Sequence, residues 1–116
     1  VPVRRDGAYF QGVVGGLLEG LRGLFMPGLK VKAEASHFRD GFVGEGYGVA
    51  TDDDLRRIRD VARRTGLFLD PVYTNKAFHG LVSMTQSGEI ARGERVLFVH
   101  TGGLFGLFPF QERLLS

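Results

Sequence analysis

The chain has 116 residues, 43% of them hydrophobic, which is enough to bury one modest core in one domain or part of one. A formal charge of +2 is too small to predict a nucleic-acid partner, and the absence of cysteine excludes a disulfide framework and a thiolate metal site. Together these properties favour a soluble protein of the cytoplasm.

The first predicted helix covers residues 12–25, where apolar side chains recur at helical spacing. The apolar stretch from Gly12 to Leu29 is interrupted by charged residues and by five glycines before Pro27, so it is not predicted to span a membrane. Two arginines precede it, but no clean small-residue cleavage site follows, which argues against a signal peptide.

Pro27 and Gly28 are expected to end this helix. Residues 29–35 then alternate apolar and charged side chains, the pattern of a strand with one face in water. Residues 37–48 carry four glycines without a sustained period and predict a long connection. Connections of this length often carry functional residues.

A second helix is predicted from Thr51 to Gly66, with Thr51 as the N-cap and Asp54 completing a capping box. Gly66 is placed to end it in a left-handed conformation. Residues 67–69 form a short apolar run typical of a strand, and residues 75–87 place apolar side chains on one face of a third helix.

Residues 95–100 are a nearly continuous apolar run, typical of a strand buried on both faces of a parallel sheet. The alternation of helices and strands predicts an α/β fold, a parallel sheet with helices on both faces. Ligands of such folds bind beyond the carboxyl ends of strands, so segments 70–76 and 101–103 are candidate binding segments. Thr74 and Thr101 stand at these junctions, where each either caps a helix or binds a ligand.

Three blocks of sequence together resemble the D-cysteine desulfhydrase / 1-aminocyclopropane-1-carboxylate deaminase family. They are GEGYG at 44–48, LDPVYTNKA at 69–77 and VLFVHTGG at 96–103, and their order and spacing agree with the family. The resemblance implies the fold-type-II architecture of pyridoxal-phosphate enzymes of the tryptophan-synthase β type, with the cofactor between two α/β domains. Residues 1–116 would then be a single, incomplete domain, the C-terminal part of the cofactor domain.

The resemblance also indicates what the chain lacks. In the family, the aldehyde of pyridoxal 5'-phosphate forms a Schiff base with a lysine in a Gly-Asn-Lys motif, and none of Lys30, Lys32 and Lys76 has that context. The chain is therefore expected to be inactive by itself, and binding of the cofactor by this chain alone is not expected. The family's Ser-, Gly- and Thr-rich phosphate loop corresponds to residues 4–12, of which Gly12 is the most plausible remnant.

The resemblance assigns roles to the remaining site residues. It places Tyr47 and Tyr73 beside the substrate and the pyridine ring, where a phenol can bind a carboxylate, stack or pass a proton. It places Thr101 opposite the pyridine nitrogen, followed by Gly102, whose lack of a side chain lets a planar ligand approach. Family members that open a cyclopropane ring carry glutamate where this chain has Thr74, so the pattern resembles the desulfhydrase branch. Without the motifs, both tyrosines would be interpreted as half-buried core aromatics.

The implied reaction converts D-cysteine to pyruvate, sulfide and ammonia. The alternatives are a 1-aminocyclopropane-1-carboxylate deaminase, or a non-catalytic truncated paralogue that serves as an assembly module. The expected partners are a small amino-acid substrate and either further copies of the chain or a missing N-terminal part, because a partial domain leaves apolar surface uncovered. Neither nucleic acid nor a membrane is expected as a partner. Three widely separated histidines predict no metal site.

Overall fold

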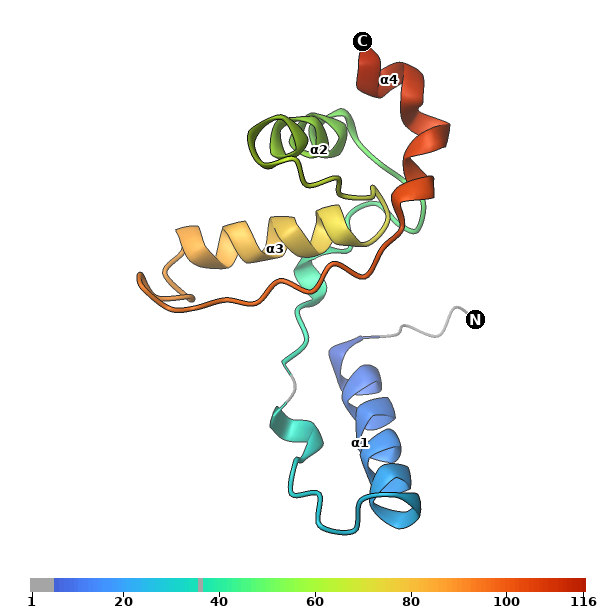
Figure 1. Cartoon of the computed structure of the whole chain (residues 1–116), viewed down its shortest axis with the longest axis vertical. Helices are drawn as coiled ribbons and strands as arrows, with labels where there is room; N and C mark the ends of the chain where they lie inside the picture. The colour runs from blue at the N-terminus through green and yellow to red at the C-terminus, as the bar shows by residue number, and fades with distance from the viewer. Residues whose placement is uncertain (1–5, 36) are drawn as a thin grey trace. The chain divides into compact units, whose positions relative to one another are not determined.

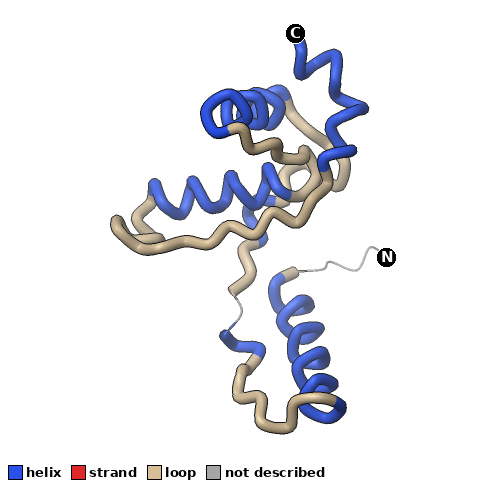
Figure 2. The backbone as a smooth tube through the Cα atoms, in the orientation of Figure 1, coloured by secondary structure: helices blue, strands red, loops and turns tan. Residues whose placement is uncertain are grey.

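The structure is a computed structural model that describes residues 6–35 and 37–116. The chain divides into two compact units, the first ending at Asp40 and the second extending from Gly41 to Ser116. All regular elements of the described residues are helical, as Figure 2 shows. Within this part of the chain, no helix combines the length and the apolar composition needed to cross a bilayer.

Helix α1 (Gly7–Leu24) begins earlier than the predicted helix at 12–25. Asp6 causes the early start, because its carboxylate accepts a hydrogen bond from the Tyr9 N–H at 3.1 Å and so caps the first turn. The loop predicted over residues 4–12 is therefore wrong for 7–12, which are helical. Residues 4 and 5 lie outside the described residues.

The strand predicted at 29–35 is also wrong, because its last three residues form the 3-10 helix η1 (Ala33–Ala35). The physical reason lies in α1. The Arg22 Nε donates to the Leu29 carbonyl at 3.0 Å, and the same guanidinium bonds the Val31 carbonyl. These bonds tie the backbone of residues 29 and 31 to α1, and no described segment pairs with them as a strand.

The second unit is built on two longer helices that pack together and a short C-terminal helix that packs on the first of them (Figure 1). The elements from residue 40 onward are η2 (Asp40–Phe42), α2 (Asp52–Thr65), α3 (Thr74–Gln86), η3 (Leu104–Phe110) and α4 (Gln111–Leu115). The Arg113 guanidinium contacts the Asp52 carboxylate at 2.6 Å and joins α4 to the start of α2.

The capping of α2 confirms the sequence analysis. The Thr51 Oγ1 accepts from the Asp54 N–H at 3.2 Å, and the Asp54 Oδ2 accepts from the Thr51 N–H at 3.0 Å. At the other end Gly66 has φ +74°, a left-handed conformation that only glycine adopts without strain. The Asn75 side-chain amide donates to the Asp54 Oδ1 at 3.1 Å, so the cap also fixes α3 against α2.

The core of the second unit lies under the apolar stripe of α2. Its buried members are Ala50, Leu55, Ile58, Val61 and Leu69. Half-buried side chains pack around them from the segment between α2 and α3, from α3, from the segment that follows α3 and from the C-terminal helices: Leu67, Phe78, Phe98, Leu107, Phe110 and Leu114. The helix that the sequence predicts most clearly is therefore also the centre of the packing.

The two remaining predicted strands do not form a sheet in the described part of the chain. Residues 67–69 and 95–100 have neither helical structure nor a paired neighbouring strand. The second segment runs back along α3 (Figure 1). There the Phe98 ring packs edge to face on the Phe78 ring, with the ring centroids 5.7 Å apart. Leu97, which was expected to be buried, is 86% exposed. A strand is stabilised by pairing, and these segments find no pairing partner here.

Replacing Thr51 with alanine tests the role of the α2 cap. The variant leaves the Asp54 N–H without its acceptor, so we expect the free energy of unfolding to fall by about 1 kcal/mol. Urea denaturation followed by circular dichroism measures this. Thr85→Ala on α3 is the control, with an expected change within about 0.5 kcal/mol because that hydroxyl is exposed. Equal losses in the two variants would contradict the capping role.

Candidate active site

The loop at residues 43–48 presents Tyr47, whose side chain is 80% exposed. The loop is attached to α3 by Lys76, whose Nζ donates to the Val43 and Gly46 carbonyl oxygens, each at 2.7 Å. Gly46 directly precedes Tyr47. The backbone that carries this phenol is therefore fixed to the first turn of α3.

The turn that presents Tyr73 is organised by the Asp70 carboxylate, which is 1% exposed. Its Oδ1 accepts from the Val72 and Tyr73 N–H groups at 2.8 Å, and its Oδ2 accepts from the Thr74 N–H at 2.8 Å and the Thr74 hydroxyl at 2.6 Å. Burial raises the pKa of the Asp70 carboxyl, but the hydrogen bonds from Thr74, Tyr73 and Val72 outweigh it, and the net pKa lies below its usual value.

Thr74 is buried and its hydroxyl is fully used. The Oγ1 donates to Asp70 Oδ2 and accepts from the Asp70 N–H at 2.8 Å. The helix-cap interpretation is wrong at this position, because Tyr73 and not Thr74 is the N-cap of α3, and the Thr74 hydroxyl bonds to Asp70 and not to an N–H of the helix. The predicted contact between Thr74 and a cofactor gains no support, because this hydroxyl points to Asp70.

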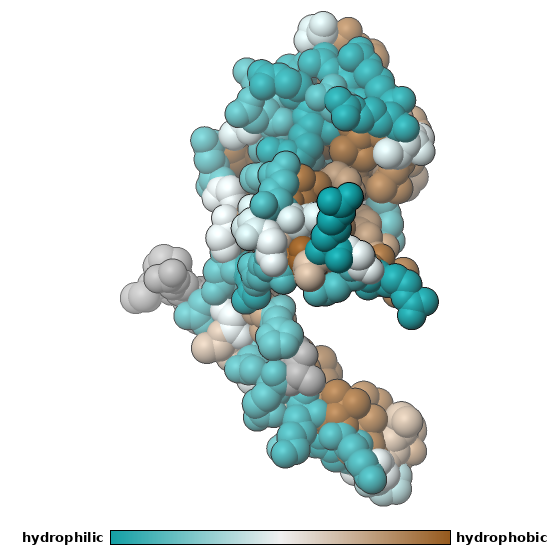
Figure 3. All heavy atoms as spheres, turned by 90° about the vertical axis from the view of Figure 1, so that its left-hand side faces the viewer, coloured by the Kyte–Doolittle hydropathy of each residue, from teal (hydrophilic) through white to brown (hydrophobic). Residues whose placement is uncertain are grey.

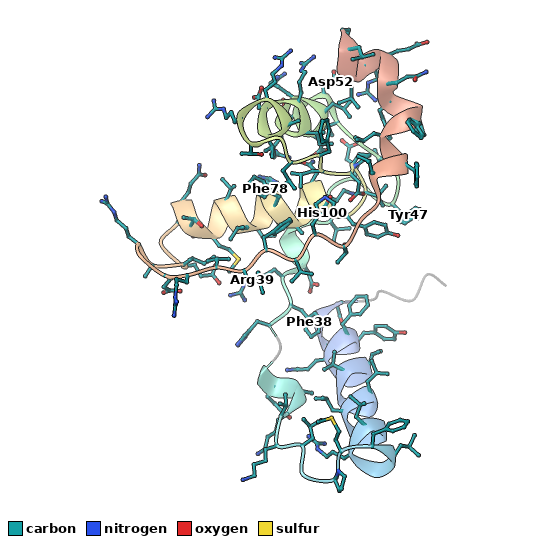
Figure 4. All side chains as sticks on the ribbon, in the orientation of Figure 1. Phe38, Arg39, Tyr47, Asp52, Phe78 and His100 are labelled. Atoms are coloured by element: carbon teal, nitrogen blue, oxygen red, sulfur yellow. The ribbon has the colours of Figure 1, made fainter. Side chains whose placement is uncertain are left out.

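The structure brings the two predicted tyrosines together. The Tyr73 hydroxyl donates to the Tyr47 hydroxyl across 3.3 Å, with ring centroids 6.0 Å apart and the planes at 69°. Because Tyr73 is 57% exposed and Tyr47 more so, neither is a core aromatic. The hydrogen bond to Tyr47 raises the pKa of Tyr73, since it favours the protonated phenol. Figure 4 shows Tyr47 at the end of the second unit where α3 begins.

Thr101 is exposed and lies in a turn that contacts Phe68 and Asp70. The His100 Nδ1 accepts from the Gly102 N–H at 3.2 Å, so the ring Nε2 carries the proton and donates to the Phe68 carbonyl at 2.9 Å. Gly103 packs on Asp70, as a Cβ at this glycine would lie 2.7 Å from the Asp70 Cγ. Asp70 thus connects the turn that bears Thr101 to the turn that bears Tyr73.

Gly12, the other predicted cofactor contact, belongs to the first unit. It lies inside α1, where backbone N–H groups bond to carbonyls of the same helix and are not presented to a ligand. Its predicted role stays a prediction.

Sequence reasoning missed three residues that support the site: Lys76, Asp70 and His100. For Asp70 a signal existed, because an aspartate followed by proline and, four residues on, by threonine is typical of a side chain that accepts from the turn it starts. For Lys76 and His100 the contacts join distant segments, and no local pattern indicates them. Among the described residues, no group of three or more histidine and acidic side chains is arranged to hold a metal ion.

A family model described as pyridoxal-phosphate dependent enzyme matches residues 17–102. The chain therefore belongs to this family of pyridoxal-phosphate-dependent enzymes, and the resemblance found in the three sequence blocks is confirmed. A solved structure described as that of an ACC deaminase homologue is similar with a TM-score of 0.71 at 36% identity, over 96% of this chain and 32% of that chain. The family fold is thus supported, although the described residues form no sheet.

Two relatives with names in this family match nearly the whole chain. A Thermotoga maritima protein, provisionally named 1-aminocyclopropane-1-carboxylate deaminase, is 37% identical over 111 residues, which cover 96% of this chain and 33% of the relative. An Arabidopsis thaliana protein named bifunctional D-cysteine desulfhydrase/1-aminocyclopropane-1-carboxylate deaminase, mitochondrial, is 36% identical over 112 residues, 96% of this chain and 26% of the relative. The chain spans about a third or less of the length of these relatives.

The second unit presents three of the predicted site residues at its surface. The exposed phenols of Tyr47 and Tyr73 and the exposed hydroxyl of Thr101 can contact a planar ring and a bound amino acid. Next to Thr101, the point where a Gly102 side chain would lie has no heavy atom within 4 Å, which leaves room for a flat ligand.

The groups that would hold the cofactor phosphate and aldehyde fit less well. At the start of α1 the Gly7 N–H donates to the Asp40 carboxylate at 3.0 Å and the Tyr9 N–H to Asp6, so two anions already occupy the positive end of the helix. The ammonium of Lys76 is held by two carbonyl oxygens and is not a free amine.

Substituting Gly103 tests the contact between the two turns. In Gly103→Ala the new Cβ would lie 2.7 Å from the Asp70 Cγ, at a residue with φ +90°. Gly102→Ala is the matched control, because its φ of +100° is equally unfavourable while nothing lies within 4 Å. We expect the control to lose about 1 to 2 kcal/mol of unfolding free energy and Gly103→Ala about 1 to 3 kcal/mol more. Equal losses in urea denaturation would contradict the packing of Gly103 on Asp70.

The lowered pKa of Asp70 predicts a dependence of stability on pH. The carboxylate form is favoured by folding, so its contribution is present above the unfolded-state pKa near 3.8 and is lost as the pH falls through the lower folded-state pKa. Asp70→Asn should therefore weaken the acid-induced decline in unfolding free energy over this range. Parallel pH profiles of the variant and the unaltered chain would show that Asp70 does not carry the effect.

Proposed function

We propose that this chain supplies the substrate-facing wall of a pyridoxal-phosphate-dependent lyase that acts on small amino acids, with D-cysteine as the preferred substrate. The observation that carries the proposal is the pair of exposed, hydrogen-bonded phenols of Tyr47 and Tyr73, each presented by a backbone segment with its own fixed support. Side chains held in place by hydrogen bonds of a supporting shell are typical of binding and catalytic sites.

The chemistry of the proposed site divides between cofactor and chain. When bound, the cofactor supplies the electron sink that makes loss of the α-proton and of the β-substituent possible. The raised pKa makes the Tyr73 phenol a weaker acid than an ordinary tyrosine, but the phenol stays protonated at neutral pH and can donate a hydrogen bond to a substrate carboxylate or a departing sulfide. The Thr101 hydroxyl would donate to the pyridine nitrogen without carrying a charge.

The preference for D-cysteine over a cyclopropane amino acid rests on the resemblance, in which family members that open a cyclopropane ring carry glutamate at the position of Thr74. Thr74 is buried, and its hydroxyl makes two hydrogen bonds, one to the Asp70 side chain and one to the Asp70 backbone. A glutamate in its place would bring a second carboxylate against Asp70, which like-charge repulsion disfavours. The deaminase activity is therefore the second candidate, kept because a relative's name pairs it with the desulfhydrase.

The proposed reaction also needs an amine that residues 1–116 do not offer in the family's motif. We propose that a polypeptide corresponding to the remaining part of the family's length provides it, or that the chain serves as a non-catalytic assembly module. Exposed apolar side chains in both units support pairing, including Leu17 (64%), Leu24 (76%), Leu97 (86%) and Val99 (68%). Figure 3 shows such apolar surface as brown spheres on the face it presents.

A mixing experiment tests this function. With pyridoxal phosphate, the chain alone should show no visible absorption band of a lysine-linked cofactor. Addition of a polypeptide matching the N-terminal two thirds of the Thermotoga maritima relative should produce the band and release sulfide from D-cysteine faster than ammonia from 1-aminocyclopropane-1-carboxylate.

The tyrosine variants make the test specific. In the mixture, Tyr73→Phe should lower the rate of sulfide release by about 10²- to 10⁴-fold if it transfers a proton. Tyr9→Phe, a tyrosine of α1, is the matched control and should leave the rate unchanged. Complex formation without release of sulfide or ammonia would favour the assembly module, and a faster release of ammonia would favour the deaminase.

A further inference from the structure

Lys76 makes two hydrogen bonds that the proposed reaction does not use. It is the third residue of α3, and its Nζ lies 2.7 Å from the Val43 oxygen and 2.7 Å from the Gly46 oxygen. Hydrogen bonds from an ammonium are about twice as strong as those between neutral groups. One side chain therefore fastens both ends of a four-residue stretch of the 43–48 loop to the helix.

This loop has little conformational preference of its own. Gly44, Gly46 and Gly48 have φ values of +69°, +145° and +73°. Glycine at these positions avoids strain in the folded loop, but it also allows many other conformations, so an external contact must select the observed one. Lys76 makes that contact, and its Cε and Nζ lie 3.6 Å from the point that a Gly44 Cβ would occupy.

The selected conformation decides where the Tyr47 phenol lies. The side chain is 80% exposed, so packing does little to orient it, and its position follows from the backbone at Gly46 and Gly48. Its ring contact is with Tyr73, at a centroid distance of 6.0 Å. Tyr73 immediately precedes α3, the helix that carries Lys76. The two phenols meet because the first turn of α3 positions both: Tyr73 directly precedes it, and Lys76 in this turn binds the loop that carries Tyr47.

We propose that Lys76 is a positioning residue, whose ammonium holds the 43–48 loop so that the Tyr47 phenol stays within hydrogen-bond reach of Tyr73. The role of the tyrosines toward a substrate rests on the proposed function, whereas the positioning depends only on contacts within this chain. A lysine in this role is occupied as a hydrogen-bond donor, and releasing it as an amine would free the loop.

Titration of the phenols tests the proposal without cofactor or substrate. In a Tyr9→Phe background only Tyr47 and Tyr73 absorb as phenolates on raising the pH. Lys76→Met keeps most of the aliphatic stem and removes the donor, so the Tyr73 pKa should fall toward its ordinary value of 10.0, matching the chain that carries Tyr47→Phe. Lys76→Arg retains a charged donor and should restore at least part of the difference. Lys32→Met, in the first unit, is the control and should change nothing.

Two results would overturn the proposal. One is a folded Lys76→Met chain, judged by its circular dichroism and a cooperative urea transition, whose Tyr73 titrates as in the unaltered chain. The other is an arginine variant indistinguishable from the methionine variant. If Lys76→Met does not fold, the unaltered chain provides the test. Nuclear Overhauser effects between the Lys76 Hε and Gly44 Hα protons are then expected, and their absence would contradict the contact between Lys76 and the 43–48 loop. Loss of activity in the mixing experiment leaves these readouts unaffected, so the two proposals fail separately.

Discussion

The buried carboxylate of Asp70 is the constraint on which the candidate site depends. It accepts four hydrogen bonds from the three residues after Pro71, and it also forms the surface on which Gly103 packs. A buried charge is tolerated only when its acceptor positions are filled, so the turn has little freedom. Two segments that are far apart in sequence are thereby held together in a part of the chain where no sheet aligns them.

Tyr47 is positioned independently of Asp70, by the hydrogen bonds from Lys76 to the loop that carries it. The site is therefore assembled from three connecting segments, each held by side chain to backbone hydrogen bonds and not by strand pairing. Such bonds are individually modest in net free energy, about 0.5 to 1.5 kcal/mol, and somewhat more when one group is charged. The geometry around the phenols is consequently sensitive to single substitutions, whereas the core beneath α2 depends on many apolar contacts.

The parts of the fold that the sequence predicts well are those with local causes. The cap at Thr51, the end of α2 at Gly66 and the meeting of the two tyrosines follow from short-range chemistry or from a motif with fixed spacing. The strand predicted at 95–100 fails because a strand requires a partner that the described residues do not provide. The carbonyls that Lys76 binds lie 33 and 30 positions away in the sequence, and composition gives no indication of such a pairing.

The hydrogen bond between the Gly7 N–H and Asp40 joins residues that are 33 positions apart and closes the first unit on itself. No described residue of this unit is fully buried, so the unit is held by hydrogen bonds such as this one and not by a buried apolar core. Opening such a unit exposes little new apolar surface, and its free energy of local opening must be small compared with that of the unit around α2. The backbone amides are therefore expected to exchange with solvent fastest in the segment that ends at Asp40 and slowest around the buried Leu69.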